Sequence, residues 1–216
     1  MHFTKGETMA RMTVEQRRAA LIDAAYEVIA ESGVEGATTR RVCAHAEMPL
    51  ASFHYAFESR MALLGAVIEQ AVPRDLVVMI GEIQNEVPPG GMAGMRREMT
   101  DTLRNLGDLM LQDAGRLQAT ASLAIFAHNH PELRSAGRKM YSTATETVAQ
   151  ALEVAAAKHG TAWSIEPGEL GTLLISATDA IKMAYLTTSD EKVARTVVDG
   201  VVTWMMTYAV DERADG

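Results

Sequence analysis

The sequence predicts an all-α protein, and three observations support this. Apolar residues make up 48% of the 216 residues, whereas aromatic residues make up only 5%. Runs of β-branched and aromatic residues with a period of two, which would indicate strands, are absent. Apolar residues instead recur at the i, i+3, i+4 and i+7 spacing of amphipathic helices. A chain of this length has room for one large helical domain or two small ones.

The first predicted helix follows a short N-terminal stretch, residues 1–12, which we expect to be a flexible tail. Thr13 and Gln16 have the spacing of a capping box. Gly33 is expected to end this helix. Its apolar face is predicted to be formed by Leu21, Ala24, Ala25, Val28 and Ile29. Arg17 and Arg18 lie near its start, where they could contact a phosphate or face solvent.

Two short helices separated by a tight turn at Glu47 and Met48 are predicted between residues 38 and 57. Thr38 is a suitable N-cap for the first helix. Pro49 suits the first turn of the second, where its missing N–H has no cost. Apolar residues spaced four apart give each helix an inward face, namely Val42 with Ala46 and Phe53 with Phe57. In a helix-turn-helix of this kind the second helix enters the DNA major groove while the first crosses the backbone.

More helices are predicted after the helix-turn-helix. Ser59 is expected to cap a helix that runs towards Ala71, where Pro73 would end or kink it. The helical period continues to Ile83 and is broken by Pro-Pro-Gly-Gly at 88–91. Beyond this break the apolar spacing predicts helices over about 92–111, 114–128, 131–158, 167–188 and 190–210.

From Thr13 to about Val72 the chain resembles the DNA-binding domain of TetR-family transcriptional regulators. The family pattern runs roughly T-x-x-x-[IVL]-A, then A-G-V-S, x-G-x-[LIF]-Y-x-H-F and x-[SN]-K-x-x-L. The matching positions are Thr38, Val42, Ala46, Phe53, Phe57, Ser59 and Leu63. The chain departs from the pattern at Cys43, Glu47, Met48, Pro49, Ala51, His54 and Arg60.

The resemblance implies three parts: a flexible tail over 1–12, a three-helix DNA-binding domain over 13–72 with its helix-turn-helix at about 38–57, and a helical bundle over 73–216. The bundle is expected to bind an effector and to dimerise. The predicted DNA-binding residues are Thr38, Thr39, Arg40, Arg41, Leu50, Ala51, Ser52, His54, Tyr55 and Arg60. Among them, Arg40 is expected to reach a guanine edge and Arg60 a phosphate.

The last two predicted helices carry wide apolar faces that need a partner surface. In the resembling family these two helices pair with their copies in a second subunit as a four-helix bundle, so we expect a homodimer. The predicted interface residues are Leu173, Ala177, Ile181, Ala184, Val197, Val201, Trp204, Met205 and Tyr208.

The fourteen methionines allow two interpretations. Met is unbranched and adapts to irregular shapes, so a Met-rich bundle either fills a loosely packed core or lines a pliable cavity for an apolar ligand. The resemblance favours an effector pocket. Its predicted lining is Met99, Leu103, Leu106, Met110, Leu117, Phe126, Met140, Tyr141 and Asp179.

The sequence contains no motif for an enzyme, a cofactor or a metal. A Gly-rich phosphate loop, H-E-x-x-H and G-x-S-x-G are all absent. His128 and His130 are two positions apart and do not share a helical face, so a helix-ending loop is expected there rather than a metal site. The single cysteine, Cys43, excludes an internal disulfide and fits a reducing cytoplasm. It is expected to be a buried packing residue. No apolar run reaches the length of a membrane span.

Charge constrains the way in which the chain could bind DNA. The net charge is −8, but residues 1–60 carry seven Lys and Arg against eight Asp and Glu, so most of the acidic excess lies after residue 60. Such a domain would bind through a few placed residues and through dimerisation rather than through bulk charge. From the resemblance we predict a repressor that binds a palindromic operator as a homodimer and is released by a small, mostly apolar effector. The alternative is a helical small-molecule carrier or adaptor whose head no longer reads DNA.

Overall fold

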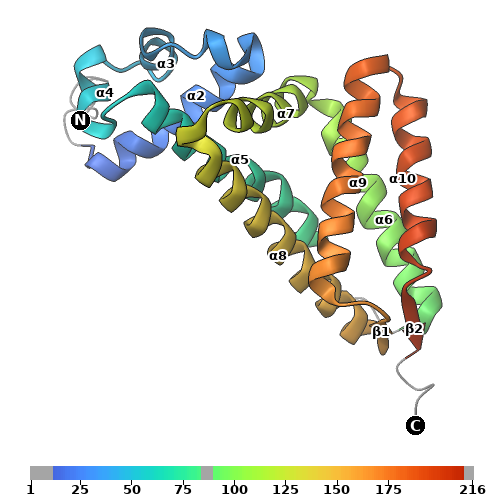
Figure 1. The fold of residues 1–216 in the computed structure, drawn as a ribbon. Coiled ribbons are helices and arrows are strands. Elements are labelled where there is room, and N and C mark those ends of the chain that lie inside the picture. Colours follow the sequence, from blue (N-terminus) through green and yellow to red (C-terminus); the bar gives the residue numbers. More distant parts are fainter. Residues whose placement is uncertain (1–11, 84–89, 212–216) are drawn as a thin grey trace, which may run out of the picture. The chain divides into compact units, whose positions relative to one another are not determined.

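The computed structural model describes residues 12–83 and 90–211, with residues 72–83 described by their backbone alone. In these ranges the chain forms nine α-helices, one short 3-10 helix and two three-residue strands (Figure 1). The predicted all-α class is therefore confirmed, apart from the two strands. The predicted tail, except Met12, lies outside the described residues, as do the prolines of the break at 88–91.

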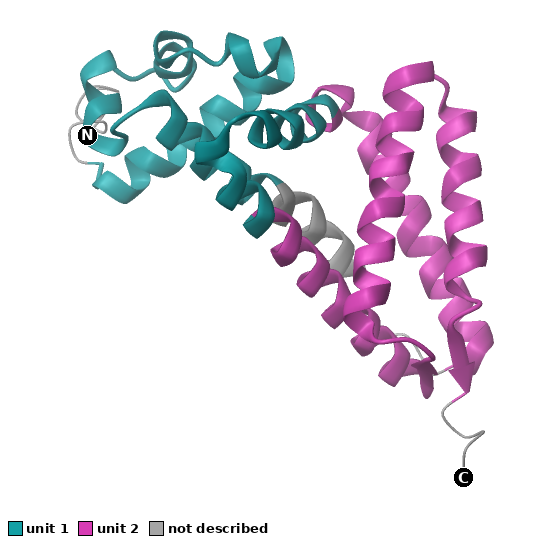
Figure 2. Ribbon diagram, viewed as in Figure 1, with its two compact units in different colours: residues 1–71, 118–139 teal, residues 72–117, 140–216 magenta. Residues whose placement is uncertain are grey.

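The chain divides into two compact units, shown in Figure 2. Unit 1 comprises residues 1–71 and 118–139, and unit 2 comprises residues 72–117 and 140–216. Unit 1 thus contains a later segment besides the N-terminal helices. The hydroxyls of Tyr26 and Thr120 lie 3.1 Å apart in a buried hydrogen bond, and Lys139 donates to Glu69 at 2.8 Å. These contacts join the N-terminal helices to the segment 118–139.

Unit 1 begins with α2 (Val14–Gly36), whose capping box between Thr13 and Gln16 is present as predicted. Gly33 interrupts the helical conformation with φ 72 and ψ 171, a backbone conformation that glycine tolerates best. Next come α3 (Thr39–His45) and α4 (Leu50–Ala56). The Thr38 hydroxyl accepts from the Arg41 N–H at 3.3 Å, which confirms the predicted N-cap of α3.

Helix α5 (Arg60–Ile83) follows, and the Ser59 hydroxyl accepts from the Ala62 N–H at 3.1 Å, as expected of its cap. The helix continues through Pro73, so this proline does not end it. Unit 1 also contains most of α7 (Ala114–Asn129), the 3-10 turn η1 (Pro131–Leu133) and the start of α8 (Arg134–His159). Its core includes the fully buried side chains of Leu21, Tyr26, Ile29, Phe53, Leu63, Leu64, Ile68 and Leu123.

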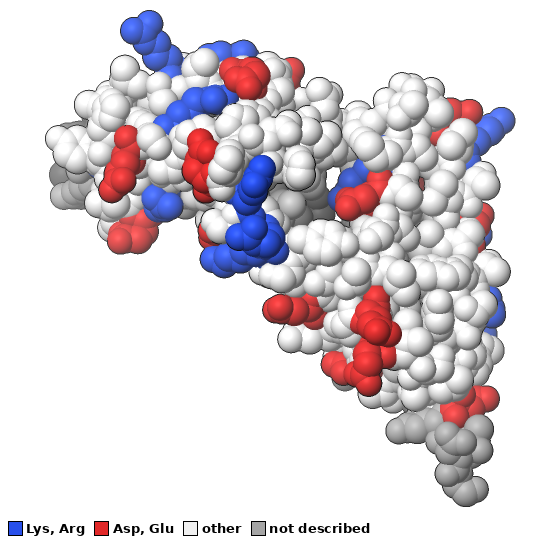
Figure 3. Space-filling view, viewed as in Figure 1, with Lys and Arg blue, Asp and Glu red and all other residues white. Residues whose placement is uncertain are grey.

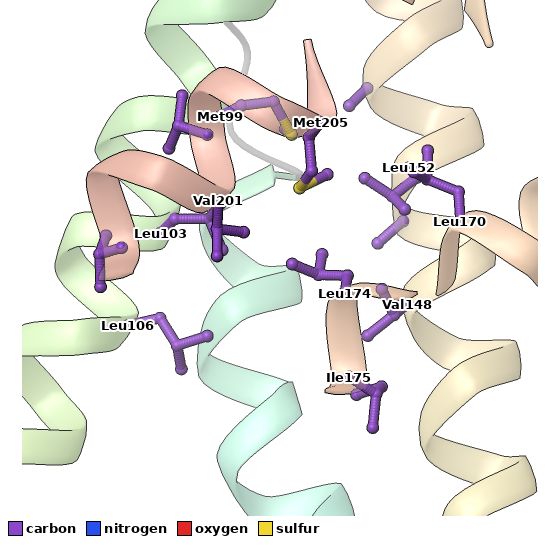
Figure 4. Close-up of a cluster of buried hydrophobic side chains, with 14 of the residues drawn as sticks. Met99, Leu103, Leu106, Val148, Leu152, Leu170, Leu174, Ile175, Val201 and Met205 are labelled. Atoms are coloured by element: carbon purple, nitrogen blue, oxygen red, sulfur yellow. The ribbon is translucent and has the colours of Figure 1, made fainter. Parts of the chain in front are cut away.

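Unit 2 is a helical bundle built from α6 (Gly91–Gln112), the rest of α8, α9 (Pro167–Thr188) and α10 (Glu191–Met205). Figure 4 shows how apolar side chains from these four helices converge. Its core includes Met99, Leu103, Leu106, Val148, Leu152, Leu170, Leu174, Ile175, Val201 and Met205. The helices approach closely at Gly171, where an added Cβ would lie 2.5 Å from the Thr145 carbonyl oxygen.

The end of unit 2 differs from the prediction. Helix α10 ends at Met205 instead of near residue 210, and β2 (Ala209–Asp211) then pairs antiparallel with β1 (Thr161–Trp163). Thr161 is opposite Asp211 in this ladder, and the Ser164 N–H donates to the Tyr208 carbonyl at 2.8 Å. A strand of three residues is too short to show a recognisable alternation of apolar and polar residues in a sequence. The predicted helix was therefore extended over the residues that form β2.

Candidate nucleic-acid interface

Helix α4 has one buried face and one exposed face, which is the arrangement that a recognition helix requires. Phe53 is buried inside the domain, and its ring packs 5.8 Å from that of the buried Phe57 just after the helix. Leu50, Ala51, His54 and Tyr55 point outward, and Tyr55 is the most exposed large side chain at 72%. Ser52 is half-buried beside them. These are the predicted α4 contact residues, and the fold leaves four of them open to a ligand such as DNA.

Helix α3 presents a second set of exposed residues next to α4. Thr38, Arg40 and Arg41 are exposed and Thr39 is half-buried, whereas Val42 and Cys43 face the core. In the described part of the chain the Arg40 guanidinium makes no hydrogen bond or ion pair, so it is available to a base edge. Burial raises the pKa of the Cys43 thiol, which keeps it protonated at neutral pH and agrees with a packing role.

The turn between α3 and α4 keeps a tight geometry although its sequence departs from the family pattern. Glu47 has φ 54, in the left-handed region where the pattern has glycine. A residue with a side chain pays roughly 1–2 kcal/mol for this conformation. The turn is closed by the Glu47 N–H, which donates to the Ala44 carbonyl at 3.1 Å, and by the Met48 N–H, which donates to Cys43 at 2.8 Å. Pro49 is the N-cap residue of α4, one position earlier than predicted.

Arg17 and Arg18 support α4 from the neighbouring helix α2. Arg18 donates from Nη1 to the carbonyl of Ala56, the last residue of α4, at 3.0 Å, and its guanidinium lies 4.2 Å from the centre of the Phe57 ring. Arg17 lies 6.0 Å from the centre of the exposed Tyr55 ring. A cation over an aromatic face contributes about 0.5–1 kcal/mol at exposed sites. The sequence offers no signal for these contacts, because Arg18 and Ala56 are 38 positions apart.

Arg60, predicted to contact a phosphate, has partners within the protein. Its side chain is 27% exposed. Nε donates to the Ala37 carbonyl at 2.9 Å and Nη2 donates to the Val34 carbonyl at 2.5 Å. The guanidinium also lies 3.7 Å from the Glu35 carboxylate. These partners hold the guanidinium against the segment between α2 and α3.

The face of unit 1 that Figure 3 shows has no continuous basic patch. On the face shown in Figure 3, Lys and Arg side chains are interspersed with Asp and Glu. This agrees with the near balance of charges in residues 1–60. Affinity for a polyanion must then depend on a few placed groups, because each neutralised phosphate adds to binding and to its salt dependence.

Comparison with known proteins agrees with this geometry. Residues 21–67, which run from the first helix through the helix-turn-helix into α5, match the family described as bacterial regulatory proteins, tetR family. The HTH-type nicotine-responsive transcriptional repressor HdnoR of Paenarthrobacter nicotinovorans is 26% identical over 192 residues, covering 89% of this chain and 95% of that protein. The chain therefore contains a DNA-binding domain of the TetR family.

Solved structures extend the similarity over both units of the regulator. The multidrug binding protein EbrR complexed with ethidium is 25% identical, with a TM-score of 0.61, over 86% of this chain and 98% of that one. A TetR transcription regulator from Haloarcula marismortui ATCC 43049 is 12% identical with a TM-score of 0.70 over 90% and 99%, which shows the shared fold. TetR-family regulators are DNA-binding transcription factors and not enzymes. No described helix of the regulator is long and apolar enough to cross a membrane.

The regulator's predicted dimer residues divide into two groups. Ile181, Val201 and Met205 are only 3%, 8% and 0% exposed within a single chain. They pack in the core of unit 2 and leave almost no exposed surface for a partner. The others keep exposed area, namely Leu173, Ala177, Ala184, Val197, Trp204 and Tyr208. Trp204 and Tyr208 meet edge to face at 5.7 Å, although Tyr208 lies beyond the end of α10.

Helices α9 and α10, which pack side by side, also share an exposed face without charged residues. We call it the uncharged α9–α10 face, and Figure 3 shows mainly white surface over these helices. It comprises Leu173, Ser176, Ala180, Met183 and Thr187 of α9, Val193, Thr196, Gly200 and Thr203 of α10, and Thr207 just after α10. Three charged side chains of the same helices form ion pairs: Lys182 pairs with Asp179 within α9, and Asp199 of α10 pairs with Arg104 of α6.

The structure brings only some of the predicted ligand-binding residues together. Met99, Leu103, Leu106, Met110 and Leu117 belong to one core cluster of unit 2. Met140 is also buried in unit 2, whereas Phe126 belongs to unit 1. Tyr141 and Asp179, predicted to meet a polar group inside the pocket, are exposed instead. Their partners are Ser176, whose hydroxyl lies 3.1 Å from that of Tyr141, and Lys182, which donates to Asp179 at 3.1 Å.

A cavity of about 240 Å³ in unit 2 has none of these residues in its lining. Its lining is Arg104, Gly107, Asp108, Leu111, Ile181, Ala194, Arg195, Val198 and Asp199. Arg104 pairs with Asp199 at 2.8 Å and Arg195 pairs with Asp108, so two reciprocal ion pairs link α6 and α10 at the rim. The same Arg-x-x-x-Asp spacing at 104–108 and 195–199 is a signal that the sequence reasoning missed.

Proposed function

We propose that this TetR-family regulator is a ligand-responsive repressor that binds a palindromic operator as a homodimer and is released by a small, mostly apolar effector. The observation that supports this most directly is the exposed face of α4, where Leu50, Ala51, His54 and Tyr55 project from a helix held from behind by Phe53 and Arg18. In such a dimer, two recognition helices must lie about one DNA turn apart, roughly 34–36 Å, to enter successive major grooves.

The proposed DNA contacts come from α3 and α4. We assign base reading to Arg40 and to the outward residues of α4, and backbone contacts to Thr38, Thr39, Arg41 and Ser52. Arg60 is left out of this set because its guanidinium bonds carbonyls of the protein. A second copy of the chain doubles the number of contacts, which compensates for a domain of low positive charge.

The proposed effector is suggested by the relatives and by the composition of unit 2. One relative is named nicotine-responsive, and EbrR was solved with ethidium. Both compounds are nitrogen heterocycles with apolar ring carbons. The core of unit 2 presents Met99 and Met110 among leucines, and Met side chains can repack around an apolar ring. We propose that the effector enters this core and favours a conformation in which the two reading helices no longer fit one operator.

The function is tested by selecting an operator from random DNA and measuring binding by electrophoretic shift, with nicotine and ethidium as probes. The proposal expects a palindromic site and release of the bound DNA by at least one probe. The same probe should raise the melting temperature of the protein, because a ligand that binds only the folded state stabilises it. Failure to enrich or shift any DNA at moderate salt would favour the carrier alternative.

Replacing Arg40 by Ala is expected to relax the preference at one operator position in each half-site. A guanidinium can bond O6 and N7 of guanine together, and such a contact discriminates by about 1–3 kcal/mol. The measurement is the affinity for the operator and its single-base variants. Arg138→Ala removes the same charge from an exposed site on α8 and serves as the control, with unchanged base preference. An equal loss on every base variant for Arg40→Ala would make Arg40 a phosphate contact.

A further inference from the structure

The Arg60 guanidinium lies where three segments of unit 1 meet. From the start of α5 it donates to the carbonyls of Val34 and Ala37. Ala37 is fully buried and directly precedes Thr38, the residue that caps α3. Arg60 therefore bonds both the last turn of α2 and the residue before the N-cap of α3.

The third segment is the end of α7. The Arg60 guanidinium lies 5.9 Å from the centre of the Phe126 ring. Phe126 is itself held in place, since its ring stacks on that of His130 at 3.8 Å and 22°, and His130 Nδ1 donates to the Phe126 carbonyl at 2.8 Å. Phe126 is 9% exposed, so this contact is nearly dry.

We propose that Arg60 and Phe126 are positioning residues for operator binding: together they tie the end of α7 to the chain just before α3, so that the recognition surface is held in its DNA-binding arrangement. This rests on the proposed operator binding. The residue type supports it, because a planar guanidinium can donate to two carbonyls at once, whereas a lysine ammonium at the same place is a flexible point charge.

The proposal and a phosphate contact predict different results for two substitutions of Arg60. If the guanidinium only contacts a phosphate, Arg60→Lys keeps the charge and most of the affinity, whereas Arg60→Gln weakens binding and lowers the salt slope by about one. If Arg60 is a positioning residue, both variants weaken operator binding about tenfold. This is the loss expected when only about a tenth of the molecules keep the DNA-binding arrangement. The salt slope then stays at the wild-type value, because no phosphate contact is lost.

Phe126→Leu tests the other half of the junction. It removes the ring but keeps an apolar side chain, so the fold should persist. We expect about threefold weaker operator binding, and the double variant with Arg60→Lys should lose less than the product of the two single losses, because both act at one junction. Arg134→Gln is the matched control, because Arg134 also donates to a carbonyl, that of His128 at 3.1 Å, but makes no hydrogen bond or ion pair with the described residues of the helix-turn-helix. It should bind the operator like the wild type.

The experiment measures operator affinity over a salt series for each variant, with circular dichroism and thermal unfolding as checks of folding. Wild-type affinity for Arg60→Lys combined with a reduced slope for Arg60→Gln would overturn the proposal. If both Arg60 variants failed to fold, Phe126→Leu would be the test of the proposal. Wild-type operator affinity for Phe126→Leu would then overturn the proposal. A wild-type protein that bound no DNA would refute the proposed function itself, which is a distinguishable result.

Discussion

Replacing Ala180 by Glu is expected to convert a dimer of this protein into monomers. Ala180 lies near the middle of the uncharged α9–α10 face, between Leu173 and Met183 along the exposed side of α9. In a two-fold dimer built on this face, the new carboxylate enters a desolvated interface twice without a partner, and removing such a charge from water costs several kcal/mol. Because each 1.4 kcal/mol is a factor of ten, the dissociation constant should rise about a thousandfold or more.

Light scattering over a range of concentrations measures this effect. The wild type should have the mass of two chains, and Ala180→Glu the mass of one. Thr172→Glu provides a control, because Thr172 is exposed on the same helix but lies seven residues before Asp179, on the stripe that already carries a charge. That variant should remain a dimer. A monomeric wild type, or loss of the dimer in both variants, would show that the uncharged face is not the interface.

Replacing Glu98 by Ala is expected to cause a large loss of stability in unit 2. Glu98 Oε2 accepts from His159 Nε2 at 2.5 Å, and Oε1 accepts from Lys158 Nζ at 3.0 Å. The side chains of Glu98 and His159 are 7% and 0% exposed. The Gly90 N–H donates to His159 Nδ1 at 3.3 Å, so Nε2 is the nitrogen that donates to Glu98. The cluster thereby fastens the start of α6 to the end of α8.

Removing one member of a buried pair leaves its partners desolvated, which typically costs about 3–5 kcal/mol. We expect the free energy of unfolding to fall by this amount in Glu98→Ala, measured by chemical denaturation. Asp108→Ala is the matched control, because Asp108 also forms an ion pair, with Arg195, but is 44% exposed. An exposed pair contributes about 0–1 kcal/mol. Similar losses in the two variants would show that burial does not strengthen the Glu98 cluster.

Local structure could be predicted well because its causes are local in the chain. The caps at Thr13, Thr38 and Ser59 form as expected, because a capping side chain bonds a backbone N–H within three residues. The spacing of Phe53 and Phe57 likewise placed both on an inward side and left Tyr55 exposed. The family match over residues 21–67 covers the Thr38 and Ser59 caps and both phenylalanines.

Long-range roles could not be predicted in this way. Arg18 and Arg60 appear in the sequence as cations near a DNA-binding motif, and nothing in their neighbours indicates that each bonds a carbonyl more than twenty residues away. The same holds for the Glu98 cluster, which joins residues about sixty positions apart. A guanidinium or carboxylate bonds whichever partner the fold brings within hydrogen-bond distance. The sequence pattern does not show which distant residues come that close.

Helices α9 and α10 show most clearly which features follow from the sequence and which follow only from the tertiary structure. The helical period by itself determined that α9 and α10 exist and that each has an apolar stripe, and the absence of charge from one side is visible in the chain. Only the tertiary structure decided which stripe faces inward. Met205 and Val201 pack among α6, α8 and α9, while Ala180 and Gly200 remain exposed. A bundle helix is covered on the sides where its neighbours lie, and the positions of those neighbours follow from the packing of the whole unit.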